Sequence, residues 1–135
     1  MQTPNLHSRR VLFTCCILAL LAFPLVVMAD VAVTIQVSPN VLNLQNCGEV
    51  VTIHTDIAYS QVASSTVTLN GVPIFYSKSD NNGFFVAKFT MEDIKNLPLN
   101  IGEYNTMTLA GVTVNNEPFT GSKAIMVVNN IPKGK

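Results

Sequence analysis

Short apolar runs with a period of two extend through most of the chain after residue 30, and this pattern restricts the fold more than any other feature. Valine, isoleucine, threonine and phenylalanine alternate with polar residues, the spacing of a half-buried β-strand, over residues 31–37, 50–58, 84–90, 103–110 and 123–129. No long apolar helix period occurs in this part of the chain. The sequence therefore predicts an all-β domain over residues 30–130, followed by a tail, 131–135.

Turn sequences separate these runs at regular intervals. Asn70-Gly71 between two apolar runs favours a two-residue type I′ hairpin, and Asp80-Asn81-Asn82-Gly83 marks a second hairpin. Thr90 followed by Asp93 resembles a capping box, which predicts one short helical turn through Lys95. About seven or eight short strands result, and two antiparallel sheets packed face to face bury them most economically.

The first 29 residues differ from the rest and predict export. A polar, positively charged start precedes an uncharged apolar run, residues 11–29, which ends Val27-Met28-Ala29. A secretory signal peptide has this order, so we expect cleavage between Ala29 and Asp30 and a secreted or periplasmic protein. The apolar run is also close to the length that spans a bilayer, so an uncleaved membrane anchor is the alternative.

Charge and cysteine content restrict the partners and the stabilisation of the remaining chain. It holds eight acids and six lysines that are scattered singly, so no basic stripe follows a phosphate backbone and nucleic acid is not expected as a partner. Its one cysteine, Cys47, has no partner for an internal disulfide. Because free cysteines are usually small buried hydrophobes, Cys47 is expected in the core, and a bond to another chain is the alternative.

Two sites contain residues that can bind metals or move protons. His54 and Asp56 lie two apart on the polar face of the run 50–58, but no nucleophile motif accompanies them and zinc needs further ligands. Asp80 and Asn82 offer oxygen ligands for calcium, but the distant acid of a calcium loop is missing. A solvated strand face and a tight turn are the favoured interpretations, and neither a cofactor nor an enzyme activity is expected.

Aromatic residues gather around the second hairpin. Phe85 and Phe89 share the parity of the core, whereas Phe75 and Phe84 have the opposite parity to their apolar neighbours. An exposed aromatic surface with Tyr76, able to bind a sugar or a protein, is one interpretation. The other is a hairpin that is covered on both faces. The candidate contact surface consists of Phe75, Tyr76, Phe84, His54 and Asp56.

A series of short phrases runs along the chain in the order Ser38 to Leu44, Val50 to Ile57, Ser65 to Gly71, Phe85 to Phe89, and Leu109 to Thr113 with Phe119-Thr120-Gly121. This order resembles a bacterial and archaeal immunoglobulin-like module that occurs repeatedly at the ends of large secreted proteins. The resemblance implies an immunoglobulin-like antiparallel β-sandwich and brings no catalytic residues with it. Tyr104 resembles the corner tyrosine of such sandwiches in position only, because its parity directs the ring away from the core.

These features favour an exported, non-enzymatic domain that acts in protein–protein contact or as a structural part of the cell envelope or extracellular space. A carbohydrate- or calcium-binding module is the first alternative, and a hydrolase that uses His54 and Asp56 is the second. The sequence indicates neither the partner protein nor the oligomeric state, and it places the protein at a membrane only if the first segment stays uncleaved.

Overall fold

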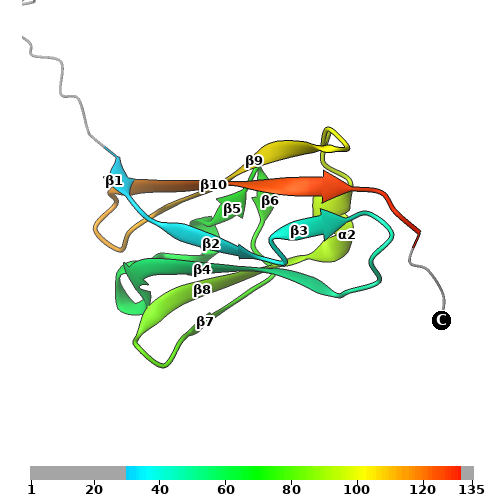
Figure 1. Ribbon diagram of the computed structural model, residues 1–135. Helices are drawn as coiled ribbons and strands as arrows, with labels where there is room; N and C mark the ends of the chain where they lie inside the picture. Colours follow the sequence, from blue (N-terminus) through cyan, green and yellow to red (C-terminus); the bar gives the residue numbers. More distant parts are fainter. Residues whose placement is uncertain (1–29, 132–135) are drawn as a thin grey trace, which may run out of the picture.

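The computed structural model describes residues 30–131, which form two stacked β-sheets and one short helix (Figure 1). The elements in chain order are β1 Val31–Ala32, β2 Ile35–Ser38, β3 Val41–Asn43, β4 Val50–Ala58, the 3₁₀ turns η1 Tyr59–Gln61 and η2 Ser64–Thr66, β5 Thr68–Leu69, β6 Val72–Pro73, β7 Tyr76–Ser79, β8 Phe84–Thr90, α2 Met91–Lys95, β9 Glu103–Val112 and β10 Pro118–Val128. The predicted all-β class is therefore confirmed. The predicted signal segment, including Ala29, and the tail beyond residue 131 lie outside the described residues.

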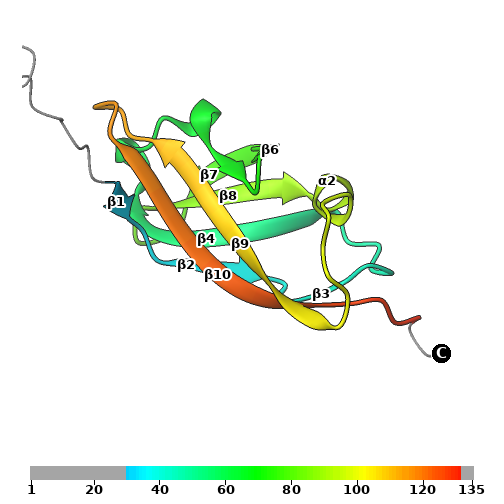
Figure 2. The ribbon, with the colours of Figure 1, turned by 90° about the horizontal axis from the view of Figure 1, so that it is seen from above.

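The two sheets differ in size and lie face to face. Sheet A has the strand order β1-β10-β9-β5-β6, and β3 also pairs with β10; sheet B has the order β2-β4-β8-β7. Neighbouring strands are antiparallel, except that β1 and β3 run parallel to β10. Seen from above, β9 and β10 cross over β4 and β8 (Figure 2).

The first predicted strand, residues 31–37, is divided between the two sheets. β1 pairs with β10 in sheet A, and β2 pairs with β4 in sheet B. The Val33 N–H still donates to the Thr120 carbonyl of β10 at 2.9 Å. After a cis Ser38–Pro39 peptide the chain returns to sheet A as β3. Divided strands of this kind raise the number of strands among the described residues to ten, where seven or eight were expected.

The core lies between the sheets and consists of the inward-facing residues of both. Phe85 and Phe89 are fully buried, as their parity predicted. Further fully buried side chains come from β4, β5, β9 and β10, namely Ile53, Leu69, Met107, Leu109, Phe119 and Val127. Burial of such a side chain contributes about 1.5–3 kcal/mol to stability, so this layer is the main source of stability in a domain that has no internal disulfide.

Local signals placed the turns and the helix correctly, but not the lengths of the strands. Asn70 and Gly71 have φ angles of 49° and 86° in the tight turn between β5 and β6, as the predicted type I′ hairpin requires. The Thr90 hydroxyl accepts a hydrogen bond from the Asp93 N–H, so the predicted cap of α2 is confirmed.

No helix within residues 30–131 is long and apolar enough to cross a membrane.

Three strand boundaries were wrong for identifiable reasons. The apolar runs on either side of Asn70-Gly71 predict strands over residues 65–69 and 72–76, but the turn η2 ends only at Thr66, so β5 is limited to Thr68–Leu69. β6 ends at Pro73, and the chain then crosses to sheet B as β7. β10 begins at Pro118 and not at residue 123, because Gly121 interrupts the apolar alternation in the sequence while its backbone continues the pairing with β9.

Candidate functional site

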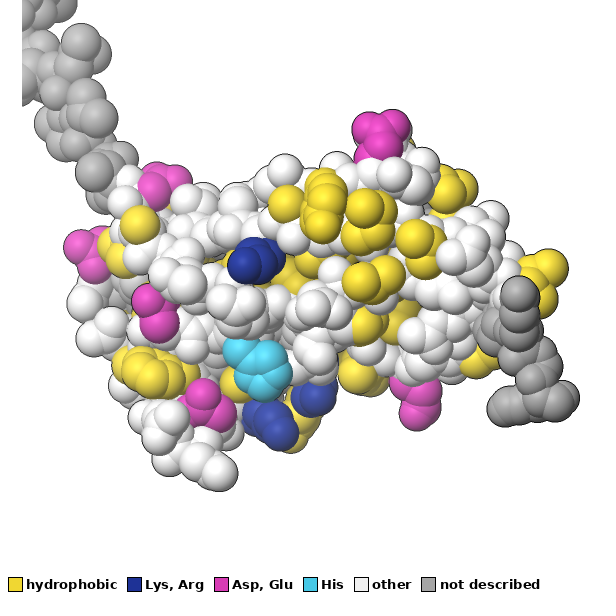
Figure 3. Space-filling view, viewed as in Figure 1, with side chains coloured by type: hydrophobic (Ala, Val, Ile, Leu, Met, Phe, Trp, Pro, Cys, Tyr) yellow, Lys and Arg dark blue, Asp and Glu magenta, His cyan; other side chains and the backbone are white. Residues whose placement is uncertain are grey.

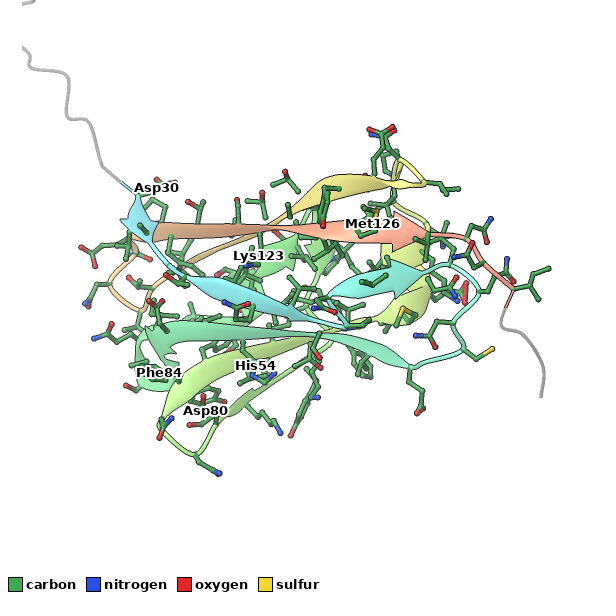
Figure 4. The ribbon with its side chains drawn as sticks, in the orientation of Figure 1. Asp30, His54, Asp80, Phe84, Lys123 and Met126 are labelled. Carbon is green, nitrogen blue, oxygen red and sulfur yellow. The ribbon has the colours of Figure 1, made fainter. Side chains whose placement is uncertain are left out.

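The outer side of sheet B carries a cluster of long polar side chains. Pairing places Gln36, His54, Val86 and Lys78 in one row, and Thr52, Lys88 and Tyr76 in the next. We call this the lysine face; it consists of Gln36, Thr52, His54, Tyr76, Lys78 and Lys88. In Figure 3 the histidine and two lysine side chains gather on the lower part of the molecule, and Figure 4 shows His54 on the side of β4 away from sheet A.

Val86 is a buried apolar residue beneath the side chains of the lysine face. Its neighbours Phe85 and Ala87 point into the core, so Val86 points outward, yet its exposed fraction is 0%. Its partners on the adjacent strands are His54 and Lys78, whose long side chains therefore cover it. The Lys78 ammonium is thus carried on a stem that lies beside the buried Val86.

Of the residues predicted for the contact surface, His54 and Tyr76 share the lysine face. Phe84 is half-buried and lies opposite Ala58, beyond a bulge in β4. The Asp56 carboxylate accepts a hydrogen bond from the Thr34 N–H at 2.9 Å, which attaches the segment between β1 and β2 to β4. Asp56 therefore has a structural partner in the backbone, outside any pair with His54.

The two most exposed aromatic residues of this region do not form one platform. Phe75 and Tyr76 have exposed fractions of 63% and 54%. They are consecutive residues of an extended segment that pairs with β8, so their rings point to opposite sides of it. Only Tyr76 belongs to the lysine face.

Asp80 closes the second hairpin. Its Oδ1 atom accepts hydrogen bonds from the N–H groups of Asn82 and Phe84, at 2.8 and 2.9 Å, and Gly83 has the positive φ angle that the turn needs. The carboxylate that was a candidate calcium ligand with Asn82 thus makes the bonds of a tight turn. Within residues 30–131, no three His, Cys, Asp or Glu side chains are grouped to hold a metal ion.

Cys47 is exposed, so the expectation that it is buried was wrong. It lies in the loop between β3 and β4, where the side chains of Asn43 and Asn46 hold the backbone. This loop belongs to neither sheet, so it has no side that faces the core. Cys47 therefore stays at the surface although free cysteines are usually buried.

Asn105 is a structural residue that sequence reasoning missed. Tyr104 is 70% exposed, as its parity predicted, whereas Asn105 points inward at the start of β9. Its amide donates to the carbonyls of Asn100 and Glu103 and accepts from the Asn100 N–H at 2.8 Å. The available signal was a polar residue at an inward position of an alternating run.

The outer side of sheet A, which sequence reasoning also missed, has a different chemistry. We call it the uncharged face; its outward positions on β9 and β10 are Tyr104, Thr106, Thr108, Ala110, Val112, Pro118, Thr120, Ser122, Ala124 and Met126. None of these ten residues is charged. The sequence signal was the lack of charge at every even-numbered position of both runs.

The molecule therefore has two chemically distinct outer faces, one with two lysines and a histidine and one without charge. No protein-family model, curated protein or solved structure matches the chain. Both faces offer what a contact surface needs, namely exposed side chains held on rigid strands.

Proposed function

We propose that the chain is an exported, non-enzymatic immunoglobulin-like domain that binds a partner protein through its lysine face. The strand orders support the fold part of the proposal. The order β2-β4-β8-β7 corresponds to A-B-E-D of an immunoglobulin sandwich, and β10-β9-β5 corresponds to G-F-C, with β6 as an added C′ strand. Asn105 also occupies the place of a corner residue, at the start of strand F with bonds to the preceding loop.

Export is supported by the position of the first strand. β1 begins at Val31, directly after the expected cleavage point, so removal of residues 1–29 leaves the pairing of β1 with β10 intact. The mature protein is then secreted or periplasmic. N-terminal sequencing of the native protein is expected to begin at Asp30, and a sequence that begins at Met1 would contradict cleavage.

The single observation that carries the contact role is the lysine face itself. Lys78 and Lys88 lie on adjacent strands beside the exposed ring of Tyr76, and the Lys88 ammonium donates to the neutral Thr52 hydroxyl at 3.3 Å. Two ammonium groups in this arrangement favour a partner with acidic groups, and tyrosine is a frequent source of binding energy at interfaces. We therefore propose an acidic surface on the partner protein.

The same geometry supports the non-enzymatic part of the proposal. A His–Asp relay requires the carboxylate to orient the imidazole, but Asp56 accepts from the Thr34 backbone. His54 is exposed on the outer face of sheet B.

A carbohydrate-binding module is the second candidate, and the exposed ring of Tyr76 favours it. A sugar can stack on this ring and bond to the neighbouring lysines. Binding of neutral glycans that survives replacement of both lysines but not replacement of Tyr76 would select this candidate over the acidic protein.

The test compares two double variants with the same change of charge. Lys78→Gln/Lys88→Gln removes two charges of the lysine face, while Lys133→Gln/Lys135→Gln removes two lysines of the C-terminal tail. In quantitative pull-downs from the native compartment we expect the first variant to retain about tenfold less partner and the second to retain the wild-type amount. Equal losses in both variants, or no loss in the first, would refute the lysine face as the contact site.

A further inference from the structure

We propose that the uncharged face of sheet A joins two copies of this chain in an antiparallel dimer. This inference goes beyond the proposed function, because it concerns the opposite sheet and a second copy of the same protein. In the dimer the two lysine faces point away from each other, and each stays free for its own partner.

Charge distribution is the first argument for a second copy as the occupant. Residues 30–131 contain eight acids and four lysines, yet none of them falls on the ten outward positions of β9 and β10. In a two-fold dimer a face meets its own copy, so any net charge on it meets the same charge. The lysine face would bring Lys78 and Lys88 close to the same lysines of the other copy, whereas the ten outward positions of the uncharged face carry no charge, and like charges meet only at its rim.

The apolar pattern on this face is symmetric along the strands. Ser122 and Thr108 form a cross-strand pair with their hydroxyl oxygens 2.9 Å apart. Four residues away on one side, Met126 pairs with Tyr104; four residues away on the other, Pro118 pairs with Val112. Both ends of the face are thus apolar, and the centre carries hydroxyl groups.

The proposed two-fold axis lies between the two copies, perpendicular to the strands, and passes over Ser122 and Thr108. It brings an apolar end of one copy over the opposite apolar end of the other. It reverses the strand direction, so Tyr104 of one copy covers Val112 of the other, and Met126 covers Pro118. Val41 of β3 lies beside Met126 and is 47% exposed, so it extends the contact by one strand. Figure 2 looks onto this face, with β10 and β9 in front.

The size of the face limits the dimer to a weak one. Ten residues at about 3.4 Å give a length of about 34 Å, and the two strands β9 and β10 at about 4.8 Å each give a width of about 10 Å. The product, about 330 Å² per copy, is well below the roughly 800 Å² per partner of a standard protein interface, and β3 adds only the short contact at Val41. We therefore expect a dissociation constant in the high micromolar range.

Association through the β10 edge of sheet A is opposed by Lys123. β1 and β3 cover the two ends of the β10 edge, at Phe119–Thr120 and Met126–Val128, and leave the middle without a strand partner on that side. Lys123 lies there at an inward position opposite Met107, yet its side chain is exposed (Figure 4). An inward-register lysine is a known protection of strand edges against pairing with another chain.

Sedimentation velocity of protein produced from the full chain, at about 5–500 µM, tests the dimer. We expect the sedimentation coefficient to rise with concentration from a monomer to a dimer value. Ala124→Glu adds a charge near the proposed axis and is expected to weaken the dimer at least tenfold. Ala124→Ser keeps the position neutral, and Gln36→Glu adds the same charge to sheet B; both are expected to retain the wild-type constant.

Thr106→Glu is the second variant on the uncharged face and is expected to act like Ala124→Glu. Equal thermal midpoints, measured where all variants are monomeric, establish that the fold is unchanged. A monomer at every concentration overturns the proposal, and so does a dimer that Gln36→Glu weakens while Ala124→Glu does not. The Lys78→Gln/Lys88→Gln variant is expected to dimerise like the wild type. Dimerisation through the uncharged face is thereby distinguished from partner binding through the lysine face.

Salt dependence adds a second readout. The two-fold brings the end of the face with Glu103 over the end with Glu117, so the acids of the two copies approach each other at the rim. Because salt screens this repulsion, we expect the dimer to tighten between about 0.05 and 0.5 M NaCl. A dimer that weakens over this range would indicate opposite charges in the contact and would contradict the uncharged face.

Discussion

Single polar side chains hold the loops of this domain at positions where the sheets alone cannot. Asn105 bonds to both backbone groups of Asn100 and so closes the loop that leads into β9. Asp56 and Asp80 likewise accept backbone N–H groups, at the crossing between β1 and β2 and at the second hairpin. Side chains that resemble catalytic or metal-binding groups in the sequence therefore serve here as substitutes for backbone pairing.

Replacement of Asn105 tests this role. Asn105→Leu leaves the Asn100 N–H and two carbonyls without their partner inside a half-buried loop, so we expect a loss of about 1–3 kcal/mol in the free energy of unfolding. Urea denaturation measures it. Thr106→Ala, one residue further and exposed, is expected to change stability by less than about 0.5 kcal/mol. A loss of less than about 0.5 kcal/mol for Asn105→Leu as well would contradict the structural role of the Asn105 amide.

At the scale of elements, the short hairpin of β5 and β6 depends on a side chain from its turn. β5 and β6 have two residues each, but Asn70 between them extends the contact with β9. The Asn70 N–H donates to the Thr108 carbonyl, its side-chain oxygen accepts from the Thr108 N–H at 2.7 Å, and its amide donates to the Thr106 carbonyl. The turn residue thus acts as an additional strand position.

Asn70→Gly separates the two properties of this residue, because glycine keeps the positive φ angle and loses the side-chain bonds. We expect a loss of about 1–2 kcal/mol in the free energy of unfolding and faster amide exchange at Thr108. Gly71→Asn, at the other positive-φ position of the same turn, retains the bonds of Asn70 and serves as the comparison. Unchanged exchange at Thr108 in Asn70→Gly would contradict the bridging role.

Sequence alternation predicted the elements whose partners lie within one sheet and failed where the chain changes partners. The inward sides of β4, β8 and β9 follow from a period of two, and Asn70-Gly71 fixes its own turn by local sterics. The division of residues 31–37 depends instead on contacts with β10, far along the chain, which no local pattern contains. The bond of Asp56 to Thr34 spans 22 residues, and Cys47 lies in a loop without parity, so neither was predictable.

At the scale of the whole molecule, the two sheets divide the surface into a lysine face and an uncharged face. The sandwich buries its apolar residues between the sheets and leaves two outer faces, one proposed to bind an acidic partner and one proposed to bind a second copy. His54 and Tyr76 were predicted for the contact surface and share one face, whereas the lysines and Val86 that complete it become evident only from the strand register.

Photo-crosslinking in the native compartment shows directly whether the lysine face contacts a partner protein. A photoreactive phenylalanine derivative replaces Tyr76 on the lysine face or, as the control, Tyr59, which is exposed in η1 outside that face. We predict a discrete crosslinked species of higher mass from position 76 that is lost in the Lys78→Gln/Lys88→Gln background, and none from position 59. No crosslink at position 76, or the same species from both positions, would contradict the proposed role of the lysine face.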